Sequence, residues 1–86
     1  MTATQSTKIG NDHVWVEVTL CKVGGPYHIH TTRYSERHDP SGLKTGEGET
    51  VPADAAEAAY ERAVEAAKAW YAHETAPLRQ YASPVL

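Results

Sequence analysis

The sequence predicts an α+β fold in which an antiparallel β-hairpin, or a three-stranded sheet, packs against one long amphipathic helix. Residues 14–21 alternate strictly between apolar and other side chains, which is the period of a half-buried strand. Residues 53–73 are dense in helix-forming residues and repeat apolar side chains at steps of three and four. The 86 residues suffice for one small domain, which we expect at residues 12–76, between a flexible arm at 1–11 and a tail at 77–86.

The first predicted strand starts after His13 and ends at a turn around Gly24 and Gly25, because glycine tolerates positive φ. Residues 27–34 resume the β pattern and complete a hairpin. A two-residue turn pairs Trp15 with Tyr34, Leu20 with Ile29 and Cys21 with His28. The apolar face then carries Val14, Val16, Val18, Leu20 and Ile29, and the opposite face carries Trp15, Glu17, Thr19, Cys21, His28, His30, Thr32 and Tyr34. Arg33 falls on the apolar face, where we expect the helix to leave the strand uncovered.

Residues 35–48 are polar and rich in glycine, so we expect a loop there, with a short third strand near residues 44–49 as an option. The helix is expected to start at Pro52, with Thr50 or Val51 as its N-cap. Its apolar stripe consists of Ala56, Tyr60, Ala63, Ala67 and Trp70. A row of acidic side chains follows another face of the helix at Glu57, Glu61 and Glu65.

Charge and composition exclude several classes of protein. The chain has 11 acidic residues against 8 Lys and Arg, and its formal net charge is −3. Most of the acidic residues lie in the helical half, which would repel a phosphate backbone, so direct nucleic-acid binding is not expected. No stretch approaches the ~18 consecutive apolar residues of a membrane span. Residues 1–12 lack the apolar centre of a signal peptide and Cys21 is the single cysteine, so we expect a cytoplasmic location.

Two sets of side chains could support chemistry. Cys21, His28 and His30 share one face of the predicted hairpin, and such ligands could hold zinc with an open fourth position. Structural zinc sites, however, usually use tight turns such as Cys-x₂-Cys, which this sequence lacks. The second set, a histidine-based site for the cleavage of RNA, would use His28, His30, Arg33, Arg37 and His38. Neither set matches a strong catalytic motif, so no metal or cofactor is expected.

A binding surface is the third candidate. Trp15 and Tyr34 lie on the hairpin face away from the helix, and aromatic side chains there are typical interface anchors. The alternative is that the arm or the tail covers these two rings within the monomer. We expect partner-binding residues at Trp15, His28, His30 and Tyr34, with the acidic row Glu57, Glu61 and Glu65 as the second choice.

Two short motifs add a family resemblance. Residues 39–42 (Asp-Pro-Ser-Gly) look like an acidic-Pro-Gly stretch, and residues 48–50 (Gly-Glu-Thr) look like a Gly-acidic-Thr start of a helix. An alanine- and glutamate-rich helix follows over residues 55–66. Over residues 13–72 the chain therefore resembles the N-terminal domain of HicB-like antitoxins. That resemblance implies a partner-binding fold that occludes a toxin and is not an enzyme.

These observations together predict a small non-enzymatic protein-binding module, antitoxin- or inhibitor-like, that acts by occluding a partner protein. The alternative is a metal-dependent or histidine-based hydrolase or nuclease that uses the face of Cys21, His28 and His30. A third interpretation is a homodimer, in which two hairpin faces or edges pair across a twofold axis. The sequence does not identify the partner protein.

Overall fold

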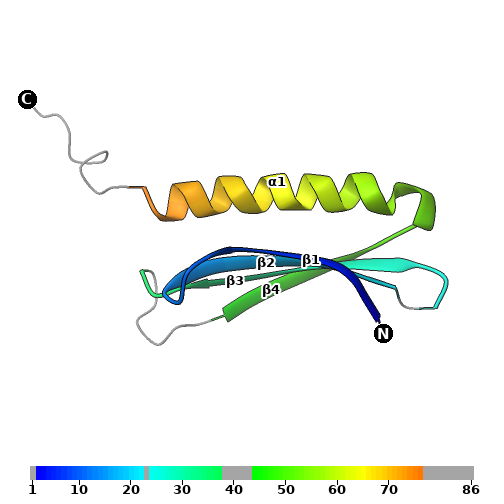
Figure 1. Ribbon diagram of the computed structural model, residues 1–86, viewed down its shortest axis with the longest axis horizontal. Coiled ribbons are helices and arrows are strands. Elements are labelled where there is room, and N and C mark those ends of the chain that lie inside the picture. The colour runs from blue at the N-terminus through cyan, green and yellow to red at the C-terminus, as the bar shows by residue number, and fades with distance from the viewer. Residues whose placement is uncertain (1, 23, 38–43, 77–86) are drawn as a thin grey trace, which may run out of the picture.

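A four-stranded antiparallel sheet and one helix form two layers in the computed structural model, which describes residues 2–22, 24–37 and 44–76. The strands follow one another in the sheet in the order β1-β2-β3-β4. Their bounds are Thr2–Gly10 (β1), Val14–Lys22 (β2), Tyr27–Ser35 (β3) and Lys44–Val51 (β4). A 3₁₀ turn at Ala53–Ala55 leads into the helix α1 (Ala56–Glu74), which lies along one face of the sheet (Figure 1). The predicted α+β class is confirmed, and the optional third strand is present as β4.

The first strand, β1, differs from the flexible arm that we expected at residues 1–11. It pairs with β2 from Thr2 to Gly10, with an irregularity between Ala3 and Gln5. Residues of this segment are small and polar, but a strand ladder is held by main-chain hydrogen bonds that need no apolar side chains. The segment also begins a tight turn, in which the Asn11 side-chain oxygen accepts hydrogen bonds from two main-chain N–H groups.

The register between β2 and β3 is the predicted one. Leu20 pairs with Ile29, Trp15 with Tyr34 and Cys21 with His28. The predicted apolar face is buried under α1, and Val16 and Val18 are fully inaccessible to solvent. Because side chains alternate along a strand, this register directs the whole opposite face of β2 and β3 away from the helix.

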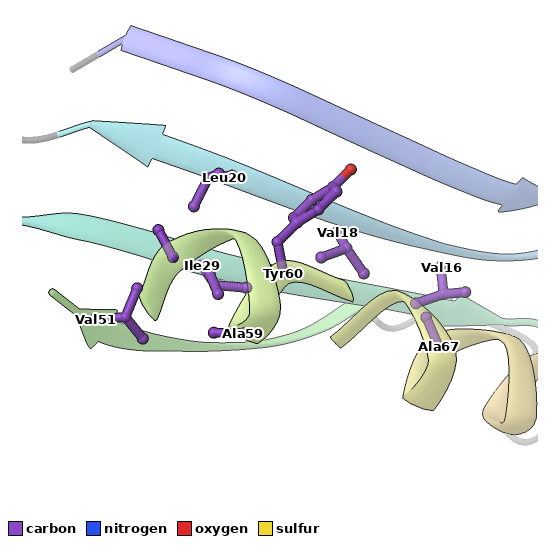
Figure 2. Packing of buried hydrophobic residues seen from close by; sticks show 9 residues of the cluster. Val16, Val18, Leu20, Ile29, Val51, Ala59, Tyr60 and Ala67 are labelled. Atoms are coloured by element: carbon purple, nitrogen blue, oxygen red, sulfur yellow. The ribbon is translucent and has the colours of Figure 1, made fainter. Parts of the chain in front are cut away.

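The core lies between α1 and the centre of the sheet (Figure 2). The small Ala67 lies beside Val16. Tyr60 packs near Leu20 and Val18, and its ring extends over β2 toward β1. There its hydroxyl forms a 2.6 Å hydrogen bond with the Thr7 hydroxyl. This bond joins the helix to the edge strand, so β1 belongs to the same packed unit as the rest of the sheet.

The start of the helix differs from the predicted one, and its end at Glu74 lies close to the predicted end. Thr50 and Val51 are the last residues of β4 and not a helix N-cap, and residues 48–50 therefore lie in a strand. The strand ends there because Pro52, which has an extended backbone, has no N–H to donate to the ladder. At the other end, the guanidinium of Arg37 donates to the main-chain oxygens of Glu74 and Ala76. A cation at this position also interacts favourably with the helix dipole.

The helices that the structure describes include none with the length and apolar character needed to cross a membrane. Residues 38–43 and 77–86 lie outside the described residues, together with the predicted tail and the Asp-Pro-Ser-Gly motif at 39–42. Nothing in the described part of the sheet therefore tests these two predictions.

We predict that Gly10→Ala strongly destabilises the fold. Gly10 has a φ of 122°, and an added Cβ would lie 2.2 Å from the main-chain oxygen of Val14. We expect the free energy of unfolding to fall by about 2–4 kcal/mol in urea titrations. Gly25→Ala is the matched control, because nothing lies within 4 Å of its Cβ position, and it should be nearly neutral. Equal losses from the two variants would contradict this account of the turn.

We also predict that the hydrogen bond between Tyr60 and Thr7 contributes about 1 kcal/mol to the free energy of unfolding. Tyr60→Phe removes the hydroxyl and keeps the buried ring. A double-mutant cycle with Thr7→Val, followed by urea unfolding, measures the coupling between the two hydroxyls. Strict additivity of the two substitutions would show that the bond does not stabilise the fold.

Candidate functional site

The sheet face opposite α1, called the outer face below, is not covered by any element that the structure describes (Figure 1). Because side chains alternate along each strand, the pairing of the strands shows which residues belong to the outer face. From β2 and β3 they are Trp15, Glu17, Thr19, Cys21, His28, His30, Thr32 and Tyr34. From the edge strands come Ser6, Lys8, Gly46, Gly48 and Thr50. Four of the predicted partner-binding residues, Trp15, His28, His30 and Tyr34, therefore share one surface.

One end of the outer face is aromatic. The rings of Trp15 and Tyr34 are cross-strand neighbours and stack with centroids 5.7 Å apart and an interplanar angle of 21°. On β1, the Lys8 ammonium lies 4.7 Å from the centroid of the Trp15 ring. Such a cation over an indole is an attractive arrangement, and it keeps a positive charge on the aromatic end. Both rings are half-buried, so each still presents part of its surface to solvent.

A hydrogen-bonded carboxylate holds Tyr34 in place. The Tyr34 hydroxyl donates to Glu36 Oε2 at 2.8 Å, and His13 Nδ1 donates to Glu36 Oε1 at 3.1 Å. These two hydrogen bonds hold the pKa of the Glu36 carboxyl below its ordinary value, and the bond from Tyr34 has the larger effect. The same bond raises the pKa of the Tyr34 phenol, because it stabilises the protonated hydroxyl. The hydrogen bond to Glu36 therefore restricts the orientation of the Tyr34 ring.

The other end of the outer face is formed by histidines. The rings of His28 and His30 stack with centroids 6.1 Å apart and an interplanar angle of 21°. The Thr50 hydroxyl lies 3.4 Å from His28 Nε2, and the His30 ring lies beside Gly48, whose missing side chain leaves room for it. Cys21 is buried in the sheet opposite His28. The two imidazole rings bring hydrogen-bonding nitrogens to this end of the outer face.

The two chemical candidates are not assembled by the fold. Among residues 2–22, 24–37 and 44–76, no group of three His, Cys, Asp or Glu side chains could hold a metal ion, so Cys21, His28 and His30 do not form such a site. Arg33 lies on the opposite face of the sheet from the histidine pair. Arg37 is bound to the end of α1, and His38 lies outside the described residues. The described members of the proposed RNA-cleaving set therefore do not converge.

The acidic row lies on a different surface from the aromatic and histidine residues. Glu57, Glu61 and Glu65 are exposed on α1, on the flank that borders β1. Glu65 forms a 3.1 Å ion pair with Lys68, of the exposed kind that contributes little to stability. Because α1 and the outer face are on opposite sides of the sheet, one flat partner surface cannot contact both sets. The aromatic and histidine residues of the outer face and the acidic row on α1 are therefore two separate candidate binding sites.

Two contributors to the outer face were missed from sequence. Lys8 was placed in a loose arm, although Gly10, Asn11 and Asp12 form a turn signal that would have predicted a strand before it. Once that turn is recognised, the pairing parity puts Lys8 beside Trp15 and Glu17. The role of Glu36 had no sequence signal, because it depends on the positions of His13 and Tyr34 at the same end of the sheet.

Comparisons of the chain with protein-family models, curated proteins and solved structures find no match. The described side chains of the outer face include two stacked aromatic rings, the Lys8 ammonium and two imidazoles. Such a set can bury apolar surface and donate hydrogen bonds to carboxylates or main-chain oxygens.

We predict a pH dependence that reports the Glu36 contacts. Because the folded pKa of Glu36 is depressed, its contribution is present above the unfolded pKa of about 4.3 and is lost as pH falls through the folded value. The difference in unfolding free energy between wild type and Glu36→Gln should therefore shrink on acidification from pH 6 to pH 3. In Tyr34→Phe, an NMR titration should show the pKa of Glu36 rising toward its ordinary value. A difference that is constant with pH would contradict the assignment.

Proposed function

We propose that this chain is a small non-enzymatic protein-binding module, antitoxin- or inhibitor-like, that occludes a partner protein with the outer face of its sheet. The observation that carries the proposal is the stacked pair of Trp15 and Tyr34, on a sheet face that no element within residues 2–22, 24–37 and 44–76 covers. The resemblance to the N-terminal domain of HicB-like antitoxins implies the same mode of action. The buried, unpaired thiol of Cys21 is consistent with a reducing, cytoplasmic location for this activity.

The aromatic pair has the properties of an interface anchor. Both rings have part of their surface in solvent, and the hydrogen bond to Glu36 limits the freedom of the Tyr34 ring. Large rings with few rotatable bonds contribute contact area at a low entropic cost on binding. The hairpin register fixes both rings on adjacent central strands, so little rearrangement of the sheet is needed when a partner binds.

Charge on the outer face indicates the chemistry of the partner. Among the side chains that the structure describes, Lys8 supplies a positive charge, and the rings of His28 and His30 add hydrogen-bonding nitrogens. Their acidic neighbour, Glu17, already accepts a 3.1 Å hydrogen bond from Ser6. The partner that fits is a protein surface with an apolar centre, which meets the aromatic pair, and carboxylates that meet Lys8 and the histidines.

The alternative function, a metal-dependent or histidine-based hydrolase, has no assembled site among the described residues, and one measurement tests it. Elemental analysis of protein purified without a tag would detect zinc bound at one equivalent. Stoichiometric zinc lost in His28→Ala would support the metal-dependent hydrolase, in spite of the buried Cys21. A homodimer through a sheet face or edge remains a prediction, and light scattering over a range of concentrations tests it.

We predict that Trp15→Ala and Tyr34→Ala each weaken partner binding by at least about tenfold, because each removes an anchor ring. The partner would first be captured on the tagged protein from a native lysate and identified by mass spectrometry. The purified partner would then be titrated against each variant by calorimetry. Circular dichroism of the variants should retain the helical signal, since neither ring belongs to the core cluster.

Trp15→Phe and a Glu57/Glu61/Glu65 triple replacement by Gln serve as controls. The first keeps an aromatic ring next to Tyr34 and should retain most of the affinity. The second changes only the exposed helix flank and should leave binding unchanged. Binding that depends on the three glutamates and not on Trp15 would move the site to the helix. Loss of the helical signal in Trp15→Ala would show that this ring is part of the core.

A further inference from the structure

A groove opens on the helix side of the sheet, along the edge strand β4. Its volume is about 310 Å³, and it is bordered by β3, β4 and α1. The groove exists because the residues that α1 turns toward it are small: Ala63 and Ala66 form its wall. Among the described residues, Val51 at the end of β4 is the one residue of this strand in the core cluster. The rest of β4 is therefore left uncovered by the helix.

The outer edge of β4 is also free of any described strand. No strand in the described parts of the chain pairs with it, since the sheet order ends at β4. An edge strand presents a row of main-chain N–H and C=O groups that an extended chain can pair with. All residues from Thr45 to Thr50 are exposed. The groove and the open edge lie next to each other, so a strand added at the edge would also border the groove.

Charged side chains on β4 face this groove. Glu47 and Glu49 are on the helix side by register, opposite Thr31 and Ile29 of β3. The Glu47 carboxylate is paired with Arg33, whose guanidinium is 2.6 Å away. This pair explains how Arg33 is tolerated on the apolar face of the hairpin. Glu49 has no ion pair with a described residue, so its charge is not compensated within this part of the chain.

We propose that the β4 edge binds an extended basic segment of a protein partner by strand addition. Main-chain hydrogen bonds to β4 would hold the segment, and every second side chain would point to the helix side. A Lys or Arg at such a position lies beside Glu49 and supplies the missing positive charge. On the other side, Gly46 and Gly48 leave the β4 backbone bare, so apolar side chains of the segment can lie over it.

A second copy of this chain is a poorer occupant of the same edge. Antiparallel pairing of two β4 strands about their centres would set Glu47 and Glu49 of one copy opposite the same residues of the other. Like charges directly opposite each other on one face are destabilising. A basic segment replaces this repulsion by attraction. The proposal goes beyond the partner surface described above, because it rests on Glu49 and on the main chain of β4 and not on the aromatic pair.

The test is a titration of the full chain with a synthetic peptide, N-acetyl-(Lys-Val)₄-amide, followed by NMR chemical shifts of the main-chain amides. We expect the largest shifts in β4, followed by Ala63 and Ala66. Glu49→Lys should weaken binding by at least about tenfold, because it turns an attraction into a repulsion. Glu61→Lys, which makes the same charge change on the exposed β1 flank of α1, should change the affinity by less than about twofold.

A second peptide separates strand addition from general charge attraction. Methylation of alternate main-chain nitrogens keeps every lysine but removes hydrogen bonds to an edge strand, so binding should be lost. Equal losses in Glu49→Lys and Glu61→Lys, or binding that survives methylation, would overturn the proposal. So would shifts confined to the outer face, or a dimer in light scattering that Glu49→Lys disrupts. Trp15→Ala should not alter peptide binding, which separates this result from the test of the outer face.

Discussion

A single helix packs on this four-stranded sheet, and the rest of the molecule depends on which part of the sheet it covers. The contacts of α1 are made chiefly to β2, with fewer to β3 and β1. Burial of Val16 and Val18 beneath α1 supplies the main apolar contact of the fold. Because the helix is centred on β2, it leaves the outer face and the helix side of β4 without a cover from any described element. Both proposed binding surfaces follow from this one placement.

Alternation along β2 made the centre of the fold predictable. A strand with an apolar side chain at every second residue has one stable orientation, because a shift of its register by one residue would expose all of its valines. The glycines at the turn then set the pairing with β3, and the four outer-face residues Trp15, His28, His30 and Tyr34 follow by parity. For the same reason Arg33 was placed on the helix side, where Glu47 compensates its charge.

The edge strands were harder to predict, for a physical reason. β1 and β4 contribute few buried side chains, so neither carries the apolar pattern that identifies a central strand. Their stability comes from main-chain pairing, and in β1 from the hydrogen bond between Thr7 and Tyr60. The start of the helix was misplaced by the same effect: Thr50 has the chemistry of an N-cap, but pairing with His28 keeps it in the strand. Long-range pairing outweighed the local preference there.

Geometry links the two uncovered surfaces. A segment that adds to β4 places every second side chain on the outer face, beside Gly46 and Gly48 and one strand away from His28 and His30. Strand addition would thus widen the outer face on the side of the histidines, while the aromatic end with Trp15 and Tyr34 would keep its present neighbours. A partner with an extended basic segment next to an acidic, apolar-centred surface could occupy both sites at once. Linked sites of this kind raise the effective concentration of the second contact after the first has formed, so modest affinities at each site can give stable occlusion.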